Sequence, residues 1–201
     1  MDLKLAELAP LERYKLLIGL VIPRPIAWIS TYSPNRVANC APFSFFNVFS
    51  EDPPLCVIGI NPRSDGQIKH SLKNIRRTRE FVVNLVDEAT ANAMHLSSRE
   101  FPEEVSEFAE IGLTPARAIT VQHPRIAEAA ACLECKLERL IVISPTRELV
   151  LGEIQLIHAR DGIIDPQTKR ISETNYRPSG RLFADRYVTT RERFNLPGKL
   201  P

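Results

Sequence analysis

The feature that most constrains the fold is a pair of long β-type segments, residues 130–143 and 148–160, separated by a short connection. The connecting residues Ser144-Pro145-Thr146-Arg147 form a short hairpin loop, so the two strands are predicted to run antiparallel. Other segments show the alternation or the β-branched and aromatic content typical of strands. Further strands are predicted at residues 26–32, 37–40, 43–49, 55–60 and 81–86.

Helical patterns are fewer than strand patterns. Helices are predicted at residues 8–19 and 66–77, with a polar helical stretch at 88–113 that Ser97-Ser98 and Pro102 interrupt. Many strands with few helices between them predict a mainly β chain with flanking helices, arranged as a closed or nearly closed antiparallel, Greek-key-like barrel. The sequence contains no repeat, low-complexity tract or linker, so we expect a single domain over residues 1–201.

Charge and hydropathy exclude two classes of partner. The 26 basic and 24 acidic residues give a net charge of +2, too little for a protein that grips duplex nucleic acid. No apolar stretch approaches the roughly 18 residues of a membrane-spanning helix. The first residues, Met1-Asp2-Leu3-Lys4, do not resemble a secretory signal. We therefore expect a cytoplasmic protein that binds neither nucleic acid nor membrane.

Two of the four cysteines, Cys132 and Cys135, form a C-x-x-C pair that could indicate redox or zinc chemistry. The surrounding residues 133–138 alternate strictly and predict a half-buried strand. Residues three apart in a strand point to opposite faces, so the two thiols are not expected to converge. No pair of histidines has metal-ligand spacing with an acid, and we expect no metal site.

The glycine pattern excludes the common nucleotide-binding loops. The chain has eight glycines, and no two of them lie within two residues of each other. Both the G-x-G-x-x-G loop and the G-x-x-x-x-G-K-[ST] loop are therefore absent. A phosphorylated cofactor would therefore have to be bound by a different kind of motif.

Two neighbouring segments, residues 23–31 and 39–47, are candidates for such a cofactor-binding motif. They read Pro-Arg-Pro-Ile-Ala-Trp-Ile-Ser-Thr and Asn-Cys-Ala-Pro-Phe-Ser-Phe-Phe-Asn. Pro42 cannot donate a hydrogen bond within a sheet, so it marks a strand edge or a bulge. Unpaired N–H and C=O groups at such a position can bind a planar heterocycle.

The same segments supply hydroxyl groups. Ser30, Thr31 and Ser44 could bind the hydroxyls of a ribityl chain or a phosphate. The alternative is that the aromatic side chains between them are simply core, as such clusters usually are. These side chains are Phe43, Phe45, Phe46 and Phe49.

A second polar segment, residues 63–75, leads into a predicted helix. Ser64 or Asp65 can cap this helix, whose first turn offers free N–H groups at the positive end of its dipole. Lys69 and Ser71 add a positive charge and a hydroxyl, which together suffice for a monophosphate site. The alternative is that Lys69 is an ordinary solvated helix lysine.

The segments at 23–31 and 39–47 resemble the flavin-binding signature of the flavin reductase-like family, whose members are FMN-binding split barrels. The likeness extends from about residue 14 to residue 194. The helix start also resembles the family's Lys-Asp-Thr-x-x-Asn-Ile phosphate motif, with His70 in place of the acid and Ser71 in place of the threonine.

The resemblance implies a homodimer that holds one non-covalently bound FMN in each of two clefts near the subunit interface. It places the Ala-Pro-Phe-Ser backbone along the isoalloxazine ring, and the hydroxyls of Ser30 and Thr31 near the ribityl phosphate. The residues expected to bind the cofactor are Ser30, Thr31, Ala41, Pro42, Phe43, Ser44, Asn47, Arg63, Lys69, Ser71 and Arg181.

Two arginine-rich segments are open to more than one interpretation. Residues 177–187 resemble the family's closing segment, in which Arg181 is expected to contact the cleft. The following Phe183-Ala184-Asp185 is bulkier than the family's small residues and is expected to narrow substrate access. The second segment consists of Arg76, Arg77 and Arg79. These arginines either interact with the end of their helix and with water, or bind the phosphates of a nicotinamide cofactor.

The resemblance implies an oxidoreductase of the flavin reductase type. Hydride from NADH or NADPH would reach FMN, and electrons would pass to a second flavin, to oxygen or to a partner monooxygenase. The cofactor carries this chemistry, so no catalytic side chain is expected. Two alternatives stay open: a non-catalytic, flavoredoxin-like FMN-binding electron carrier, and a split-barrel oxidase acting on a vitamin B6 phosphate.

Overall fold

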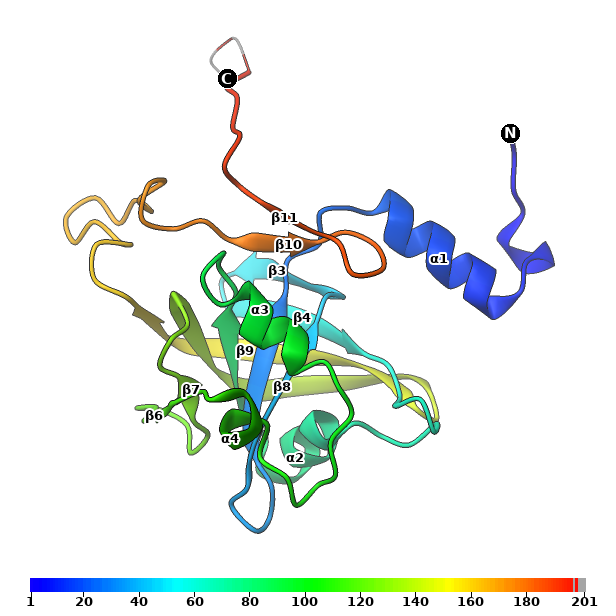
Figure 1. Ribbon diagram of the computed structural model, residues 1–201, viewed down its shortest axis with the longest axis horizontal. Coiled ribbons are helices and arrows are strands. Elements are labelled where there is room, and N and C mark those ends of the chain that lie inside the picture. The colour runs from blue at the N-terminus through cyan, green and yellow to red at the C-terminus, as the bar shows by residue number, and fades with distance from the viewer. Residues whose placement is uncertain (197, 199–201) are drawn as a thin grey trace.

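The computed structural model describes residues 1–196 and 198, and it confirms a mainly β fold with a few helices. A seven-stranded antiparallel sheet runs in the order β2-β1-β5-β8-β9-β4-β3 (Figure 1). Its strands are β1 (Ala27–Tyr32), β2 (Ala38–Phe43), β3 (Phe46–Glu51), β4 (Pro54–Ile60), β5 (Glu80–Leu85), β8 (Ala131–Ser144) and β9 (Arg147–Ala159). Two small hairpins pair β6 (Pro115–Ala116) with β7 (Arg125–Ile126), and β10 (Ser179–Arg181) with β11 (Tyr187–Thr189).

The long hairpin predicted from the sequence is confirmed by the pairing of β8 with β9. Ser144 pairs with Arg147, so the turn itself contains only Pro145 and Thr146. Across the remaining sheet, β9 also pairs with β4, and β8 also pairs with β5. The hairpin is therefore the centre of the sheet, with two strands on the β4 side and three on the β5 side.

The helices are short. They are a 3₁₀ turn at Leu5–Glu7, α1 (Pro10–Leu20), α2 (His70–Thr78), α3 (Ala91–Leu96) and α4 (Glu107–Ile111). The prediction that a helix begins near residue 66 is wrong. Gly66 has a φ of +80°, and its N–H donates to the carbonyl of Arg63. This turn delays the helix to His70, so neither Ser64 nor Asp65 caps it.

One apolar cluster collects buried side chains from all seven strands of the sheet, so the sheet curves around it as a barrel. Leu72 and Ile75 of α2 join this cluster, and α2 packs beside β1 and β2. Gly152 of β9 permits close packing inside the barrel. A Cβ at this position would lie 2.4 Å from Cζ of Phe81. The core therefore depends on Gly152, because β9 passes close to the ring of Phe81 at this residue.

A second apolar cluster covers the outer face of β1, β2, β5 and β8, beneath α3 and α4. Cys132 lies in this outer cluster, whereas Cys135 lies in the barrel core. The prediction that the two thiols point to opposite faces is confirmed. The sulfur of Cys135 instead lies 4.0 Å from that of Cys56, and all four cysteines are free.

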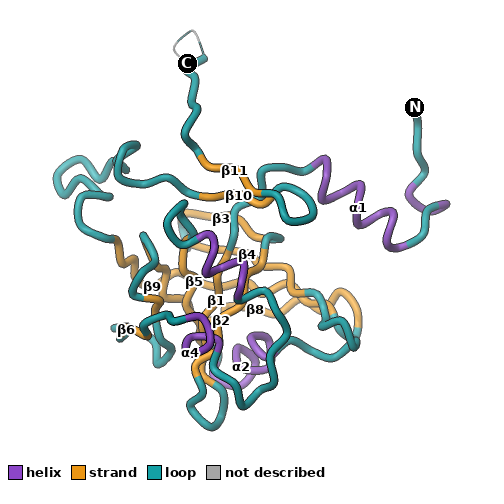
Figure 2. Tube along the Cα trace, viewed as in Figure 1, coloured by secondary structure: helices purple, strands orange, loops and turns teal. Residues whose placement is uncertain are grey.

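The helix α1 stands apart from the barrel. In Figures 1 and 2 it extends to one side, away from the strands, and ends near the β10–β11 hairpin. None of its residues is buried. Among the described residues, no helix is long and apolar enough to cross a membrane.

Candidate functional site

Two adjoining pockets meet along the edge strand β2. The smaller, which we call the lysine pocket, encloses about 60 Å³, and the larger, which we call the arginine pocket, about 270 Å³. Pro42 and Ser98 line both pockets, so the two form one continuous cleft. The lysine pocket is lined by residues 39 and 41–43 of β2, Arg63, residues 69–71, residues 97–101 and Glu107. The arginine pocket is lined by Tyr14, Ile18, Arg24, Ile26, Pro42, Ser44, Met94, Ser98, Arg181, Ala184 and Tyr187.

Lys69 stands at the start of α2, where it is the N-cap residue. Its Nζ lies 3.6 Å from a carboxylate oxygen of Glu100. Glu100 also accepts hydrogen bonds from the backbone N–H and the hydroxyl of Ser64, at 2.9 and 2.5 Å. These bonds from Ser64 lower the pKa of Glu100 to about 2. An ionised carboxylate of the chain itself therefore lies beside the lysine.

Arg63 provides a second cation in the lysine pocket. Its Nη1 lies 3.2 Å from Nε2 of His70 and donates to the carbonyl of Phe101 at 3.3 Å. Burial, and then the Arg63 charge, lower the pKa of His70, so its neutral ring accepts from Arg63. His70 thus partners an arginine at the position where the family motif has an acid. Within the described part of the chain, Nε of Arg63 is buried and has no hydrogen-bond partner.

Ser71 is connected to a buried carboxyl group through Asn39. Its hydroxyl donates to Oδ1 of Asn39 at 3.0 Å, and Nδ2 of Asn39 donates to Glu107 at 2.7 Å. Glu107 also accepts from the backbone N–H of Cys40 at 3.3 Å. Burial raises the pKa of Glu107 to about 7. The Ser71 hydroxyl is therefore positioned by a hydrogen-bond network through Asn39 to Glu107, whose pKa of about 7 is near neutral pH.

The arginine pocket is organised by Arg24, which is only 7% exposed. Its guanidinium donates to the carbonyls of Ile18, Val21 and Leu182 at 2.5, 2.9 and 2.7 Å, and to the hydroxyl of Ser44 at 3.4 Å. One side chain thereby joins the end of α1, the loop after β2 and the segment after β10. The position of this pocket depends on residues 158 apart in the sequence.

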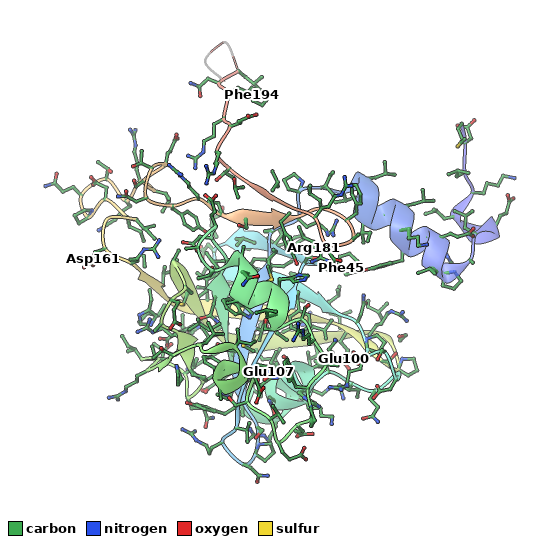
Figure 3. The ribbon with its side chains drawn as sticks, in the orientation of Figure 1. Phe45, Glu100, Glu107, Asp161, Arg181 and Phe194 are labelled. Atoms are coloured by element: carbon green, nitrogen blue, oxygen red, sulfur yellow. The ribbon has the colours of Figure 1, made fainter. Side chains whose placement is uncertain are left out.

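Arg181 and Tyr187 close the arginine pocket from the β10–β11 hairpin. The Arg181 guanidinium lies 4.7 Å from the centre of the Tyr187 ring and is hydrogen bonded to its hydroxyl. That hydroxyl also lies 3.0 Å from Nδ1 of His95 in α3. In the view of Figure 3, Arg181 and Phe45 are labelled above Glu100 and Glu107.

The structure brings together eight of the eleven residues predicted to bind a cofactor. They are Ala41, Pro42, Phe43, Ser44, Arg63, Lys69, Ser71 and Arg181. It places Ser30, Thr31 and Asn47 elsewhere. The Ser30 hydroxyl donates to the carbonyl of Pro124 at 2.5 Å. The Thr31 hydroxyl accepts from Asn74 at 3.0 Å and lies behind Asn39, and Asn47 is exposed on β3.

The edge position predicted for Pro42 is confirmed, because β2 is the first strand of the sheet. On the outer side, which the sheet leaves unpaired, the N–H of Cys40 donates to Glu107 and the carbonyl of Ala38 accepts from Ser106, while Pro42 lines the cleft. The aromatic cluster around it is divided. Phe43 and Phe46 pack in the barrel core, whereas Phe45 and Phe49 are exposed.

Several lining residues were not predicted from the sequence. The loop at residues 97–101 and Glu107 enter the lysine pocket from the stretch predicted only as polar and helical. Arg24 lies within the segment 23–31, but its hydrogen bond to the carbonyl of Leu182 has no local sequence signal. Asn39 could have been chosen, because it begins the second motif segment.

The basic run at the end of α2 lies outside both pockets. Arg76 pairs with the buried carboxylate of Glu148, and Arg77 donates to the carbonyl of Tyr32 at 2.9 Å. Arg79 donates to a carbonyl of β8 at 2.8 Å. The three side chains therefore contact groups of neighbouring strands, whereas the sequence had suggested the end of their own helix or a nicotinamide cofactor as partners.

The chemistry of the cleft follows from these groups. Two cations and a hydroxyl suit a phosphate, and the larger adjoining pocket beside an exposed strand edge suits a flat ring. No cluster of three or more His, Cys, Asp or Glu side chains among the described residues could hold a metal ion. The fold is a β-barrel, and its cleft carries groups suited to a phosphorylated, ring-containing ligand.

The chain belongs to the flavin reductase-like family, because the family model described as "Flavin reductase like domain" matches residues 19–176. An Aquifex aeolicus protein is 43% identical over 175 residues, covering 87% of this chain and 88% of its own. Bacillus subtilis YwrF is 36% identical over 195 residues, covering 94% of this chain and 95% of its own.

Solved structures agree with this assignment. The 2-nitrobenzoate 2-nitroreductase NbaA of Pseudomonas fluorescens is 36% identical with a TM-score of 0.90, covering 100% of this chain and 98% of its own. Nitrilotriacetate monooxygenase component B of Bacillus cereus is 29% identical with a TM-score of 0.92, covering 98% of both chains. A Shewanella frigidimarina protein with a split barrel domain, 21% identical with a TM-score of 0.81, covers 99% of this chain and 100% of its own, which confirms the predicted split-barrel fold.

Proposed function

We propose that this protein binds FMN non-covalently along the cleft and acts as an NAD(P)H-dependent oxidoreductase of the flavin reductase type. The observation that carries the proposal is the convergence of Arg63, Lys69 and Ser71 on one small pocket that opens into a larger one. The phosphate would lie in the lysine pocket and the ring in the arginine pocket. We infer that one domain over residues 1–201 provides this site; residues 197 and 199–201 lie outside the described part.

The lysine pocket fits a phosphate group in its donors and in its charge. Lys69 and Arg63 supply positive charge, and the nearest carboxylate to Nε of Arg63 is that of Asp65, at 3.7 Å. The hydroxyl of Ser71 would turn from Asn39 toward the phosphate. Glu100 occupies the side of Lys69 that a phosphate oxygen would approach, so it would have to yield part of that contact.

The arginine pocket fits a ring system. The carbonyl of Pro42, on the outer side of this edge strand, would bind the polar edge of the ring. Arg24 and Arg181 place two positive charges on the wall of this pocket, and these favour the negative charge that a flavin gains on reduction. Ser30 and Thr31 would support the cleft from behind, and they would not touch the cofactor.

Bound FMN would supply the redox chemistry, which is transfer of hydride from a reduced nicotinamide and of electrons onward to a second flavin, to oxygen or to a partner monooxygenase. The residues of the chain bind, orient and electrostatically tune the cofactor, and no acid or base side chain is required. Likeness to a nitroreductase and to a monooxygenase component supports a role in supplying electrons to a second acceptor. We place this activity in the cytoplasm.

A homodimer is part of the proposal. The helix α1 has no buried residue and exposes Leu11, Leu17 and Leu20, although an isolated helix of this length is marginal in water. On β3, Val48 and Phe49 are exposed as well. A second copy covering these surfaces would stabilise α1, and Asn47 on β3 would reach a cofactor only across that interface.

A second candidate function is favoured by the loop between β10 and β11. Ala184 in this loop lines the arginine pocket, and the N–H of Leu182 donates to the carbonyl of Arg186 at 3.0 Å. The loop narrows the approach to the ring position. A protein that admits FMN but excludes nicotinamide would be an electron carrier, a role named for the flavoredoxin of Desulfovibrio vulgaris, which shares the fold.

The absorbance spectrum of the purified protein, recorded after incubation with FMN and again after anaerobic mixing with NADH or NADPH, tests these functions. A yellow protein that bleaches at enzymatic rates supports the reductase. A yellow protein that neither nucleotide bleaches supports the carrier. A preparation that stays colourless with excess FMN contradicts both.

A further inference from the structure

A polar hollow lies outside the cleft, where β8 begins and β9 ends. None of its lining residues lines the lysine pocket or the arginine pocket. In Figure 3, Asp161 of this hollow is labelled at the left of the view, away from Arg181 and Glu100. We call the hollow, which has a volume of about 370 Å³, the histidine pocket. It is lined by Arg125, residues 127 and 129–132, and residues 158–161.

The imidazole of His158 in this wall is held by a fully buried carboxylate. Its Nε2 lies 2.5 Å from Oε1 of Glu134, which has no exposed surface. Glu134 also accepts from the backbone N–H of Ile119 at 2.7 Å, and from the backbone N–H and the hydroxyl of Thr120. Burial opposes ionisation, but these hydrogen bonds outweigh it and lower the pKa of Glu134 to about 2. The ionised carboxylate therefore keeps a proton on Nε2 and fixes the orientation of the ring.

The second ring nitrogen of His158, Nδ1, is open to solvent. It has no hydrogen-bond partner in the part of the chain that the structure describes. On the buried and half-buried side chains of that part, only three polar atoms lack both a partner and contact with solvent, and they belong to Arg63, Ser144 and Ser179. Nδ1 is therefore exposed. Because Nε2 is turned toward Glu134 and His158 lines the histidine pocket, the ring presents Nδ1 to this pocket.

Arg125 brings a guanidinium to the same place. Its Nε donates to the carbonyl of Arg117 at 2.9 Å, which directs the side chain. Burial raises the pKa of the Cys132 thiol to about 11, and the nearby charge of Arg125 opposes this shift. Cys132 is also the direct cross-strand neighbour of His158, so the guanidinium and the imidazole both lie beside one neutral thiol. Within residues 1–196 and 198, no carboxylate forms an ion pair with Arg125, and its two terminal nitrogens are available to a ligand.

The remaining charged groups leave the wall of the histidine pocket net positive. Arg160 and Asp161 are the other charged residues of the wall. Nη2 of Arg160 lies 3.1 Å from a carboxylate oxygen of Asp87, which is not part of the wall. Glu134 lies behind the ring and is engaged by its own donors. Together with Arg125, the wall carries two positive charges and one negative charge before any proton on Nδ1, and it therefore attracts small anions.

A tetrahedral oxyanion matches the two free groups. Two N–H bonds of a guanidinium fit two of its oxygens, and both hydrogen bonds are charge-assisted. A third oxygen facing Nδ1 requires one proton between the two atoms, which either the ring or the anion can bring. Inorganic phosphate carries such a proton at neutral and mildly alkaline pH, whereas sulfate carries none. We propose that the histidine pocket binds a phosphate group that retains a proton, through the terminal nitrogens of Arg125 and Nδ1 of His158.

NMR signals of the imidazole ring protons report this site directly, because the chain has only four histidines. Resonance assignment, checked with His158→Gln, identifies the signal of His158. The full-length protein, with and without FMN, is titrated with inorganic phosphate at pH 8 and constant ionic strength. We expect a saturable shift of the His158 signal, with a Kd on the order of 1 mM. The signal of His70 reports the lysine pocket, so the histidine pocket and the proposed flavin function can fail independently.

Arg125→Gln should raise the Kd for phosphate roughly tenfold, because it removes the charge-assisted hydrogen bonds. Arg117→Gln is the matched control, since it removes the same charge next to the pocket and leaves the wall unchanged. Sulfate should bind at pH 6, when the ring can supply the proton, and should weaken from pH 6 to pH 8 much more than phosphate does. Glycerol 3-phosphate, which is half protonated near pH 6, separates two sources of the ligand: tighter binding than inorganic phosphate at this pH identifies an ester, and weaker binding the free ion.

Three results would overturn the proposal. The first is a His158 signal of the wild-type protein that phosphate does not move, and the second is sulfate binding as tightly as phosphate at pH 8. Neither result depends on the folding of a variant. The third is equal weakening of phosphate binding in Arg125→Gln and Arg117→Gln, because the effect would then be a general loss of charge.

Discussion

The two ends of the cleft are built from different kinds of interaction. The lysine pocket gathers charges from the start of α2 and a neighbouring loop, and the chain supplies a partner for each, such as Glu100 for Lys69. The arginine pocket is a structural junction, where Arg24 joins three carbonyls from two distant parts of the chain. Changes at the first end, apart from the buried Glu107, should therefore mainly alter ligand affinity, whereas changes at the second should alter folding and affinity together.

The largest effect is expected from Arg24→Met. This change leaves the carbonyls of Ile18, Val21 and Leu182 without their charged donor in a mostly buried site. We expect the free energy of unfolding in urea to fall by about 4 kcal/mol, with FMN binding lost as well. Arg36→Met is the control, because Arg36 only stacks on the Tyr32 ring in a turn. If Arg24→Met were as stable as the wild type, the hydrogen bonds of Arg24 would not be needed to hold the two parts of the chain together.

Glu107 is the residue of the lysine pocket that should affect folding. Burial raises its folded-state pKa from 4.5 to about 7, so the folded chain keeps a proton that the unfolded chain loses at lower pH. Its contribution to stability therefore falls as pH rises from about 4.5 to 7, by on the order of 3 kcal/mol, and is constant above that range.

Urea unfolding of Glu107→Gln at pH 5 and pH 8 measures this contribution. Relative to the wild type, the variant should gain stability at pH 8 compared with pH 5. Glu110→Gln, in the same helix and exposed, is the control. If wild type and Glu107→Gln show the same change between the two pH values, Glu107 ionises normally and the network behind Ser71 is held differently.

Lys69→Ala tests the separation of affinity from stability. Loss of one charge-assisted hydrogen bond should weaken FMN binding by roughly 1.5–3 kcal/mol, with little change in unfolding. Flavin fluorescence titration measures the affinity. Lys73→Ala is a matched control on the same helix, because Lys73 pairs with Glu103 and does not line the cleft. Unchanged FMN affinity in Lys69→Ala would remove this lysine from the site.

The smallest effect is expected from Glu100→Gln, and its sign is opposite. Glu100 remains ionised at neutral pH and lies beside Lys69, so it competes with an incoming phosphate. Neutralising it should strengthen FMN binding by up to about fivefold, less at high salt. Glu103→Gln is the control. Weaker binding by Glu100→Gln would mean that this carboxylate orders Lys69 and does not compete with the ligand.

The barrel could be predicted because strand alternation and the short hairpin loop are local signals, and both are confirmed. Lys69 and Ser71 could be proposed for a phosphate site because their segment resembles the family's phosphate motif, whereas the residues alone also fit an ordinary solvated lysine. Ser30 and Thr31 show where local reasoning stops. Their hydroxyls lie in the correct segment, but the curvature of the sheet directs them to Pro124 and to Asn39 and Asn74.

The partners that set the electrostatics could not be predicted. Glu100 and Glu107 reach the lysine pocket from a stretch with no strong periodicity, and their positions depend on how α3 and α4 pack on the barrel. Arg24 bonds to a carbonyl 158 residues away. Such contacts follow from tertiary packing, which a pattern within one segment does not encode.

Calorimetric titration of the wild-type protein with FMN and with riboflavin tests the central claim most directly, since the two ligands differ only by the phosphate. A phosphate held by Lys69, Arg63 and Ser71 predicts that FMN binds at least about tenfold more tightly, and that Lys69→Ala narrows the difference. Equal affinity of the wild type for both flavins would contradict it.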